Sequence, residues 1–134
     1  MVLDISSAVI AHIHAAADAS PDLEICGLLF GTAARIETAQ HCSNVAADPA
    51  RRFELDPAAL LAAHRAVRTG GAAIVGHYHS HPSGSPVPST CDADAAAADG
   101  AIWLIAAGGE LRGWRAVADG AIHGRFDPVT LRTS

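Results

Sequence analysis

The chain has 134 residues, the size of one domain (residues 1–134) that can bury roughly two-thirds of its unfolded surface. Hydrophobic residues make up 50% of it and aromatic residues only 4%, which indicates tightly packed helices and a core of small side chains. The net charge of −5 argues against nucleic acid as the main partner, because phosphate binding needs a basic face.

The sequence carries no membrane, secretion or disulfide signal. No apolar stretch approaches the ~18 residues that a membrane span needs, and the N-terminal residues lack the basic and apolar regions of a signal peptide. The cysteines Cys26, Cys42 and Cys91 form no Cys-x-x-Cys pair, and their odd number argues against a disulfide framework. We therefore expect a cytoplasmic protein with no membrane partner.

The first half of the chain predicts two helices and a strand hairpin. Apolar residues at helical spacing follow Ser6, and Asp56-Pro57 supply an N-cap and a first-turn proline for a second helix. An apolar run and a weakly alternating segment between them predict the hairpin. The expected elements are a helix over 6–18, strands over 25–30 and 35–42, a loop over 43–52, a short strand over 53–55 and a helix over 56–68.

The second half predicts a strand, a short helix and a three-stranded meander. A strand from Ala72 continues toward His81, and an alanine-rich helix is expected over 92–99. Strands are expected over 101–106, 111–117 and 122–126, with turns at Gly108-Gly109 and Asp119-Gly120. The order of elements predicts a mixed α/β domain around one curved sheet.

Three histidines stand at the end of the strand that begins at Ala72. Because side chains at i, i+2 and i+4 share one face of a strand, His77, His79 and His81 are expected to point into one site. Two imidazoles held on a rigid strand can bind one metal ion, and neutral imidazole is a common ligand of Zn²⁺.

The third ligand is expected to be an oxygen donor that the chain brings back to the strand end. Ser89-x-x-Asp92 is a capping-box variant with aspartate in place of glutamate, so Asp92 falls in the first turn of the next helix. His79, His81 and Asp92 then make a set of two histidines and one carboxylate. Three protein ligands leave a fourth position for water, which is typical of a catalytic zinc site.

The spacing of these residues resembles the signature of the JAMM/MPN+ metalloproteases. The segment from His79 to Pro82, six further residues and Ser89-x-x-Asp92 are similar to the family's His-x-His-Pro-x6-Ser-x-x-Asp motif. Glu24 to Leu29 (Glu-Ile-Cys-Gly-Leu-Leu) is similar to its upstream Glu-x-Cys-Gly-x-Leu segment. Both occur in the expected order, and the resemblance covers about Glu24 to Trp103. The chain is more similar to compact prokaryotic members than to the larger eukaryotic deubiquitinases.

The resemblance implies a fold, an activity and a role for each site residue. The fold would be the MPN fold, a curved mixed β-sheet flanked by helices and related to the cytidine deaminases. One zinc ion would be held by His79, His81 and Asp92, with Glu24 as general acid/base and Ser89 as hydrogen-bond donor to the oxyanion. The implied substrates are amide bonds at the C-terminal tail of a ubiquitin-like or sulfur-carrier protein.

Several alternatives remain beside this hypothesis. His77 could be a ligand or a residue of the pocket rim, and Cys91 is more simply an inert small side chain than a nucleophile. Asp94, two residues after Asp92, would face about 160° away on a helix and is rejected as a ligand. A non-catalytic MPN scaffold that binds partners is a second function, although such proteins lose one or more of the five site residues. A metal-dependent hydrolase of a small-molecule amide is a third.

Overall fold

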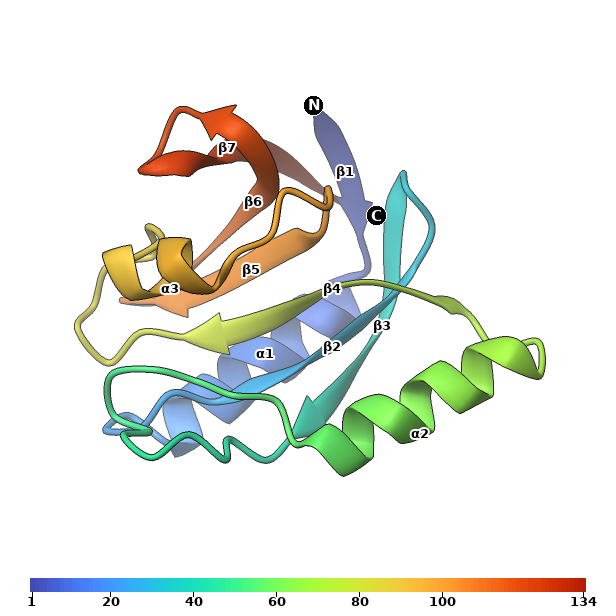
Figure 1. The fold of residues 1–134 in the computed structure, drawn as a ribbon, viewed down its shortest axis with the longest axis horizontal. Helices are drawn as coiled ribbons and strands as arrows, with labels where there is room; N and C mark the ends of the chain where they lie inside the picture. The colour runs from blue at the N-terminus through green and yellow to red at the C-terminus, as the bar shows by residue number, and fades with distance from the viewer.

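Seven strands form one strongly curved mixed sheet, and three helices pack around it (Figure 1). The computed structural model describes all 134 residues. In chain order the elements are β1 (Val2–Ile5), α1 (Ser7–Ala19), β2 (Cys26–Gly31), β3 (Arg35–Cys42), α2 (Pro57–Arg68), β4 (Ala73–Ser80), α3 (Thr90–Ala95), β5 (Ile102–Ala107), β6 (Glu110–Gly120) and β7 (Gly124–Thr133).

The sheet closes on itself in the order β1-β3-β2-β4-β5-β6-β7. The two hairpins predicted from the sequence, β2–β3 and β5–β6, are antiparallel pairs, and β4 joins them by pairing antiparallel with β2 and parallel with β5. The closing strand β1 runs parallel to both β3 and β7. The predicted curved mixed sheet is therefore present, and β1 closes it into a barrel by pairing with both β3 and β7.

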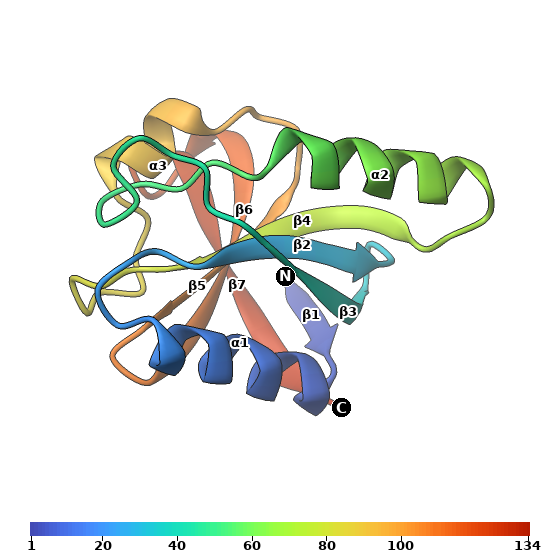
Figure 2. The ribbon, with the colours of Figure 1, turned by 90° about the horizontal axis from the view of Figure 1, so that it is seen from below.

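The helices cover different parts of the sheet. Helices α1 and α2 lie on opposite sides of β2 and β4 (Figure 2). Under α1 a core of large aliphatic side chains includes Leu3, Ile13 and Leu104, whereas α2 contributes Ala63 to a second cluster with Cys26, Leu28 and Cys42. A third cluster under α3 is aromatic and contains Trp103, Trp114 and Phe126. No helix has the length and apolarity that crossing a membrane requires.

The helix starts predicted from the sequence are confirmed. Ser6 caps α1 by accepting a hydrogen bond from the Ala8 amide at 3.2 Å, and Asp56 caps α2 through the Ala58 amide at 3.0 Å with Pro57 in the first turn. The third helix differs from its prediction, because it spans 90–95 rather than 92–99. Its cap is Ser89, so Asp92 is the third helical residue instead of the first.

Two strand predictions are wrong in part, and one strand was missed. Phe53–Leu55 forms no strand, only an isolated bridge between Leu55 and Asn44. The last strand spans 124–133 rather than 122–126. The turn predicted at Asp119-Gly120 lies inside β6 instead, and the chain reverses at 121–123, where His123 (φ 52°) and Gly124 (φ 69°) have positive φ. Strand β1 was not predicted.

Gly27 shows why the segment Glu-x-Cys-Gly contains a glycine. Its cross-strand partner on β4 is Tyr78, which is fully buried. A Cβ atom on Gly27 would lie 2.3 Å from both the Gln40 carbonyl oxygen and the Tyr78 ring. The tyrosine ring therefore fills the space of the missing side chain, and β2 can approach β3 and β4 closely on both sides.

Candidate metal centre

The pairing of β2 with β4 brings the two halves of the sequence motif together. Cys26 pairs with His79, so the chain before Cys26 runs opposite the residues that follow His79. Beyond the last strand pair, the Ser80 amide donates to the Ile25 carbonyl at 3.1 Å, and the Ser80 hydroxyl accepts from the Ile25 amide at 2.9 Å. This local clamp places Glu24 beside His81.

Three of the predicted site residues present donor atoms at nearly equal separations. The two histidine Nε2 atoms are 3.0 Å apart, and Asp92 Oδ2 lies 3.0 Å from His81 Nε2 and 3.3 Å from His79 Nε2. All three residues are buried, with at most 8% of any of them exposed. Tetrahedral ligands ~2.0–2.1 Å from zinc stand about 3.3 Å apart, so these donor atoms have the spacing of a zinc site.

A hydrogen bond orients the His81 ring toward this triangle, and a ring stack orients the His79 ring. The Ser85 carbonyl, 2.8 Å from His81 Nδ1, can only accept, so Nδ1 carries the proton and leaves the Nε2 lone pair free. The His79 ring stacks on Phe53, with centroids 4.3 Å apart and ring planes 21° from parallel. Both rings are therefore held with Nε2 toward Asp92.

The loop after β4 returns Asp92 to the strand end. The Trp114 indole N–H donates to the Pro86 carbonyl at 3.1 Å, and His123 Nε2 is 2.9 Å from the Pro88 carbonyl. The loop ends in a full capping box, in which the Asp92 amide donates to Ser89 Oγ at 3.0 Å and the Ser89 amide donates to Asp92 Oδ2 at 2.9 Å. The predicted Asp-for-Glu capping box is confirmed, and it orients the carboxylate toward the histidines.

Burial and charge give the three residues different pKa shifts. Burial alone would raise the pKa of Asp92, but hydrogen bonds from His79 and His81 hold it well below its ordinary value. Burial likewise lowers the pKa of His79, whereas the contact with Asp92 outweighs burial and raises the pKa of His81. The lowered pKa keeps the Asp92 carboxyl group ionised, as a metal ligand must be.

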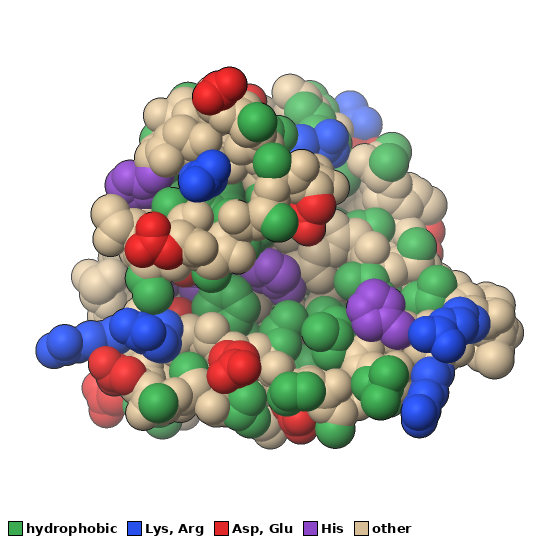
Figure 3. Space-filling view, in the orientation of Figure 1, with side chains coloured by type: hydrophobic (Ala, Val, Ile, Leu, Met, Phe, Trp, Pro, Cys, Tyr) green, Lys and Arg blue, Asp and Glu red, His purple; other side chains and the backbone are tan.

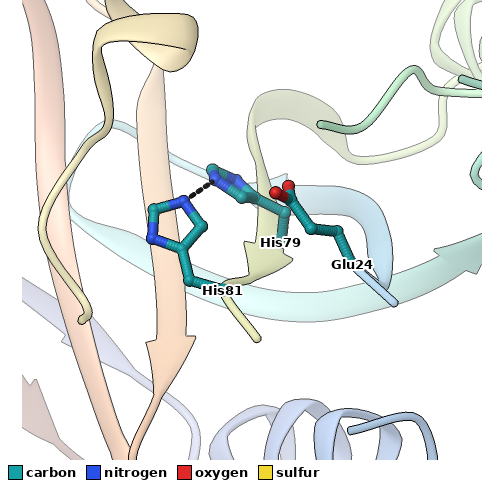
Figure 4. A group of neighbouring side chains, drawn as sticks. All are labelled: Glu24, His79 and His81. Carbon is teal, nitrogen blue, oxygen red and sulfur yellow. Dashed lines mark hydrogen bonds between the residues drawn. The ribbon is translucent and has the colours of Figure 1, made fainter. Parts of the chain in front are cut away.

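Glu24 is buried beside this triangle, close enough to the two histidines that its carboxylate could also join them as a ligand. Its carboxylate and the two histidine nitrogens lie within 4.8 Å of one another, and Figure 4 shows the carboxylate pointing toward the His79 and His81 rings. Glu24 is 5% exposed, and its Oε1 has no hydrogen-bond partner. Burial, with the Asp92 charge adding to it, raises the pKa of Glu24 to about 7 against a smaller opposite effect of His81. A carboxyl group with this pKa can take up and release a proton near neutral pH.

The backbone of Glu24 is held by residues that the sequence analysis did not assign to the site. Its amide donates to the Pro49 carbonyl at 2.8 Å, and its carbonyl accepts from Asn44 Nδ2 at 2.9 Å. Asn44 also binds the Arg52 carbonyl and the amides of Ala46 and Glu54, so one side chain organises residues 44–54. An asparagine in a polar loop is a common feature, and only the fold shows that this one faces Glu24.

The competing residues lie outside the donor set. His77 is on the same face of β4, as predicted, but its ring packs against Trp103 with centroids 4.3 Å apart. Burial lowers the pKa of His77 to about 3, which keeps the ring neutral. Cys91 and Asp94 line a different cavity, between α3 and residues 46–54.

Two depressions lie next to the centre. One, of about 200 Å³, has Glu24, Ser89 and His81 in its wall together with Arg51 and is named the reaction pocket here. The other, of about 670 Å³, follows β4 between α2 and residues 99–102 and includes His77. Figure 3 shows this face hollowed, with hydrophobic and histidine side chains gathered in the hollow. Glu24 and Ser89 therefore line one depression beside the donor triangle.

Comparison with known proteins identifies the family. The model of the prokaryotic homologues of the JAB domain matches residues 6–117, which include all five predicted site residues. A protein of Haloferax volcanii named desampylase is 39% identical over 107 residues, which cover 78% of this chain and 77% of that protein.

Solved structures agree with this assignment at the level of the fold. A protein of Desulfitobacterium hafniense has a TM-score of 0.81 at 24% identity, covering 100% of this chain and 93% of its own. A JAB1/MPN domain protein of Archaeoglobus fulgidus has a TM-score of 0.64 at 18% identity. The match covers 99% of this chain and 98% of that protein. The predicted MPN fold is confirmed. The chain belongs to the prokaryotic homologues of the JAB domain and is a compact JAMM-type isopeptidase.

Proposed function

We propose that this isopeptidase is zinc-dependent and cleaves the amide bond that joins the C-terminal tail of a ubiquitin-like or sulfur-carrier protein to an amine. The triangle of donor atoms from His79, His81 and Asp92 supports the metal, because its 3.0–3.3 Å edges and its two-histidine, one-carboxylate composition suit zinc. The name desampylase, carried by the archaeal relative, supports a protein modifier as the substrate.

Each residue has a role that follows from its position. Zinc, when bound by His79, His81 and Asp92, would polarise the scissile carbonyl and lower the pKa of water toward neutrality. Glu24 then accepts the proton of the attacking water, because its carboxylate is unpartnered and its pKa of about 7 suits proton transfer in both directions. The same group returns the proton to the leaving amine.

Ser89 serves as the donor to the oxygen that gains negative charge. Its hydroxyl oxygen accepts the Asp92 amide, which leaves the hydroxyl proton available, and the residue lines the reaction pocket with Glu24. Removing one such donor costs ~10²–10³-fold in turnover in enzymes that use an oxyanion hole.

The test is cleavage of a panel of carrier-protein conjugates by the zinc-loaded protein, with Glu24→Gln as the inactive comparison. Glu54→Gln is the matched control, because Glu54 is exposed on the loop beyond Asn44. We expect turnover by the wild type and the control, and a loss of ~10²–10⁴-fold in Glu24→Gln. Full turnover by Glu24→Gln would remove this residue from the mechanism.

A further inference from the structure

A third depression, of about 360 Å³, adjoins the metal centre and has no role in the mechanism above. Its wall contains Ser80, His81 and Pro82 at the end of β4, and the last two residues also line the reaction pocket. The rest of the wall comes from the end of α1 and from two loops. We call it the α1 pocket; its further residues are His14, Ala17, Asp18, Ser20, Pro21, Gly84 and 106–109.

The fold places these segments at one end of the molecule. The last turn of α1, the loop after β4 and the β5–β6 turn gather at the same end in Figure 2. Gly84, Gly108 and Gly109 have positive φ, and a Cβ on Gly108 would stand 3.1 Å from the Gly84 carbonyl oxygen. This part of the wall is therefore bare backbone. A volume of 360 Å³ falls in the range of ~300–1,000 Å³ that is usual for ligand pockets.

Asp18 is the one carboxylate in the wall of the α1 pocket, which the histidines His14 and His81 also line, and its charge favours a cation. No arginine lines the pocket, and the chain contains no lysine. Asp18 lies one turn after His14 on the same face of α1, so its carboxylate and an imidazole border the pocket together. The C-terminal end of α1 adds partial negative charge, and no basic residue in its last turn offsets this.

The two sides of the scissile bond differ in the side chains that they could place in the α1 pocket. The family resemblance implies a carbonyl side that often ends in Gly-Gly, and such a tail has no side chains near the bond that could fill a pocket. The amine side is a lysine within a polypeptide, which carries neighbouring side chains past the reaction pocket. The boundary formed by His81 and Pro82 is where such a neighbour would enter the α1 pocket.

We propose that the α1 pocket is the subsite for the amine side of the substrate and that it selects conjugates in which an arginine or lysine flanks the modified lysine. Asp18 is the specificity-determining residue, and it binds the flanking cation without touching the reacting atoms. This proposal rests on the proposed function, since it assumes cleavage of an isopeptide bond.

The kinetic test uses three conjugates of one carrier protein, whose modified lysine is flanked by arginine, alanine or glutamate. For Asp18→Asn we expect KM for the arginine-flanked conjugate to rise about fivefold, the size of one exposed ion pair, with kcat unchanged. The rise should shrink at high salt, and KM for the alanine-flanked conjugate should not change. Asp22→Asn is the matched control, because Asp22 is an exposed aspartate outside the α1 pocket. Equal KM changes on all three conjugates would mean a structural role and overturn the proposal.

A binding test separates this proposal from the function on which it rests. Calorimetry with Glu24→Gln measures the affinity of lysine peptides flanked by arginine or by glutamate, with no cleavage required. We expect the arginine-flanked peptide to bind more tightly and to lose about fivefold in affinity when Asp18→Asn is added. If conjugates are cleaved but these peptides bind equally, the subsite is wrong and the function stands. If no conjugate is cleaved while Asp18 still discriminates the peptides, the function is wrong and the cation site stands.

Discussion

Replacing Glu24 by glutamine removes a buried carboxylate that the metal-free protein does not pair. Its pKa rises from an ordinary value of 4.5 to about 7, so the unfolded chain loses this proton at lower pH than the folded protein. The contribution of Glu24 to stability is therefore fully present below pH 4.5 and is lost as the pH rises through 7. At ~1.4 kcal/mol per pH unit this shift has an upper limit of about 3 kcal/mol. Water in the reaction pocket screens the charge, so we expect ~1–2 kcal/mol.

The assay is urea unfolding of metal-free wild type and Glu24→Gln at pH 5 and pH 8. Glutamine has its own packing cost, but that cost is the same at both pH values. The difference in free energy of unfolding between variant and wild type should therefore shift in favour of Glu24→Gln by ~1–2 kcal/mol between pH 5 and pH 8.

The control and the refuting result use the same measurement. Glu37→Gln changes an exposed glutamate on β3 and should show no such shift. A pH-independent difference for Glu24→Gln would show that the carboxylate is solvated or paired. The account of a proton acceptor poised near neutral pH would then fail.

Three further substitutions test the metal ligand, the support of Glu24 and the packing beneath the motif. Asp92→Asn should weaken zinc binding by about 100-fold or more, measured by competition with a chelator, whereas Asp94→Asn should not, because Asp94 is exposed on α3. Asn44→Ala should lower kcat by ~10–100-fold at full zinc content, since it frees the Glu24 carbonyl; reduced zinc content would contradict this positioning role. Gly27→Ala should cost about 3 kcal/mol in thermal unfolding because its Cβ meets the Tyr78 ring. Gly124→Ala, which has open space and φ 69°, should cost only ~1 kcal/mol, and equal losses would refute the steric explanation.

The convergence of His79, His81 and Asp92 was predictable because its signals are local. His79 lies in β4 and His81 directly follows the last strand residue, Ser80, although the strand was expected to continue to His81; the capping box fixes Asp92 three residues after Ser89. These relations depend on strand and helix geometry alone. Only the approach of Glu24 needed a long-range contact, which the resemblance to a known family supplied.

The features that the sequence did not predict depend on contacts between distant segments of the chain. Strand β1 has four residues and exists because its backbone pairs with β3 on one side and β7 on the other. The alternation around Phe53 indicated a strand, but the ring instead stacks on His79, where a tertiary contact overrides local propensity. Asn44 acts on Glu24 from 20 residues away. Nothing in its local sequence distinguishes it from an ordinary loop asparagine.

The most direct test of the metal centre is a crystal structure of the zinc-loaded protein with an anomalous map at the zinc edge. The account predicts one ion per chain, with His79 Nε2, His81 Nε2 and an Asp92 oxygen ~2.0–2.2 Å from it. The Glu24 carboxylate should remain outside the coordination sphere. An ion bound directly by Glu24 with both histidines, and with Asp92 displaced, would contradict the assignment of ligand and proton acceptor.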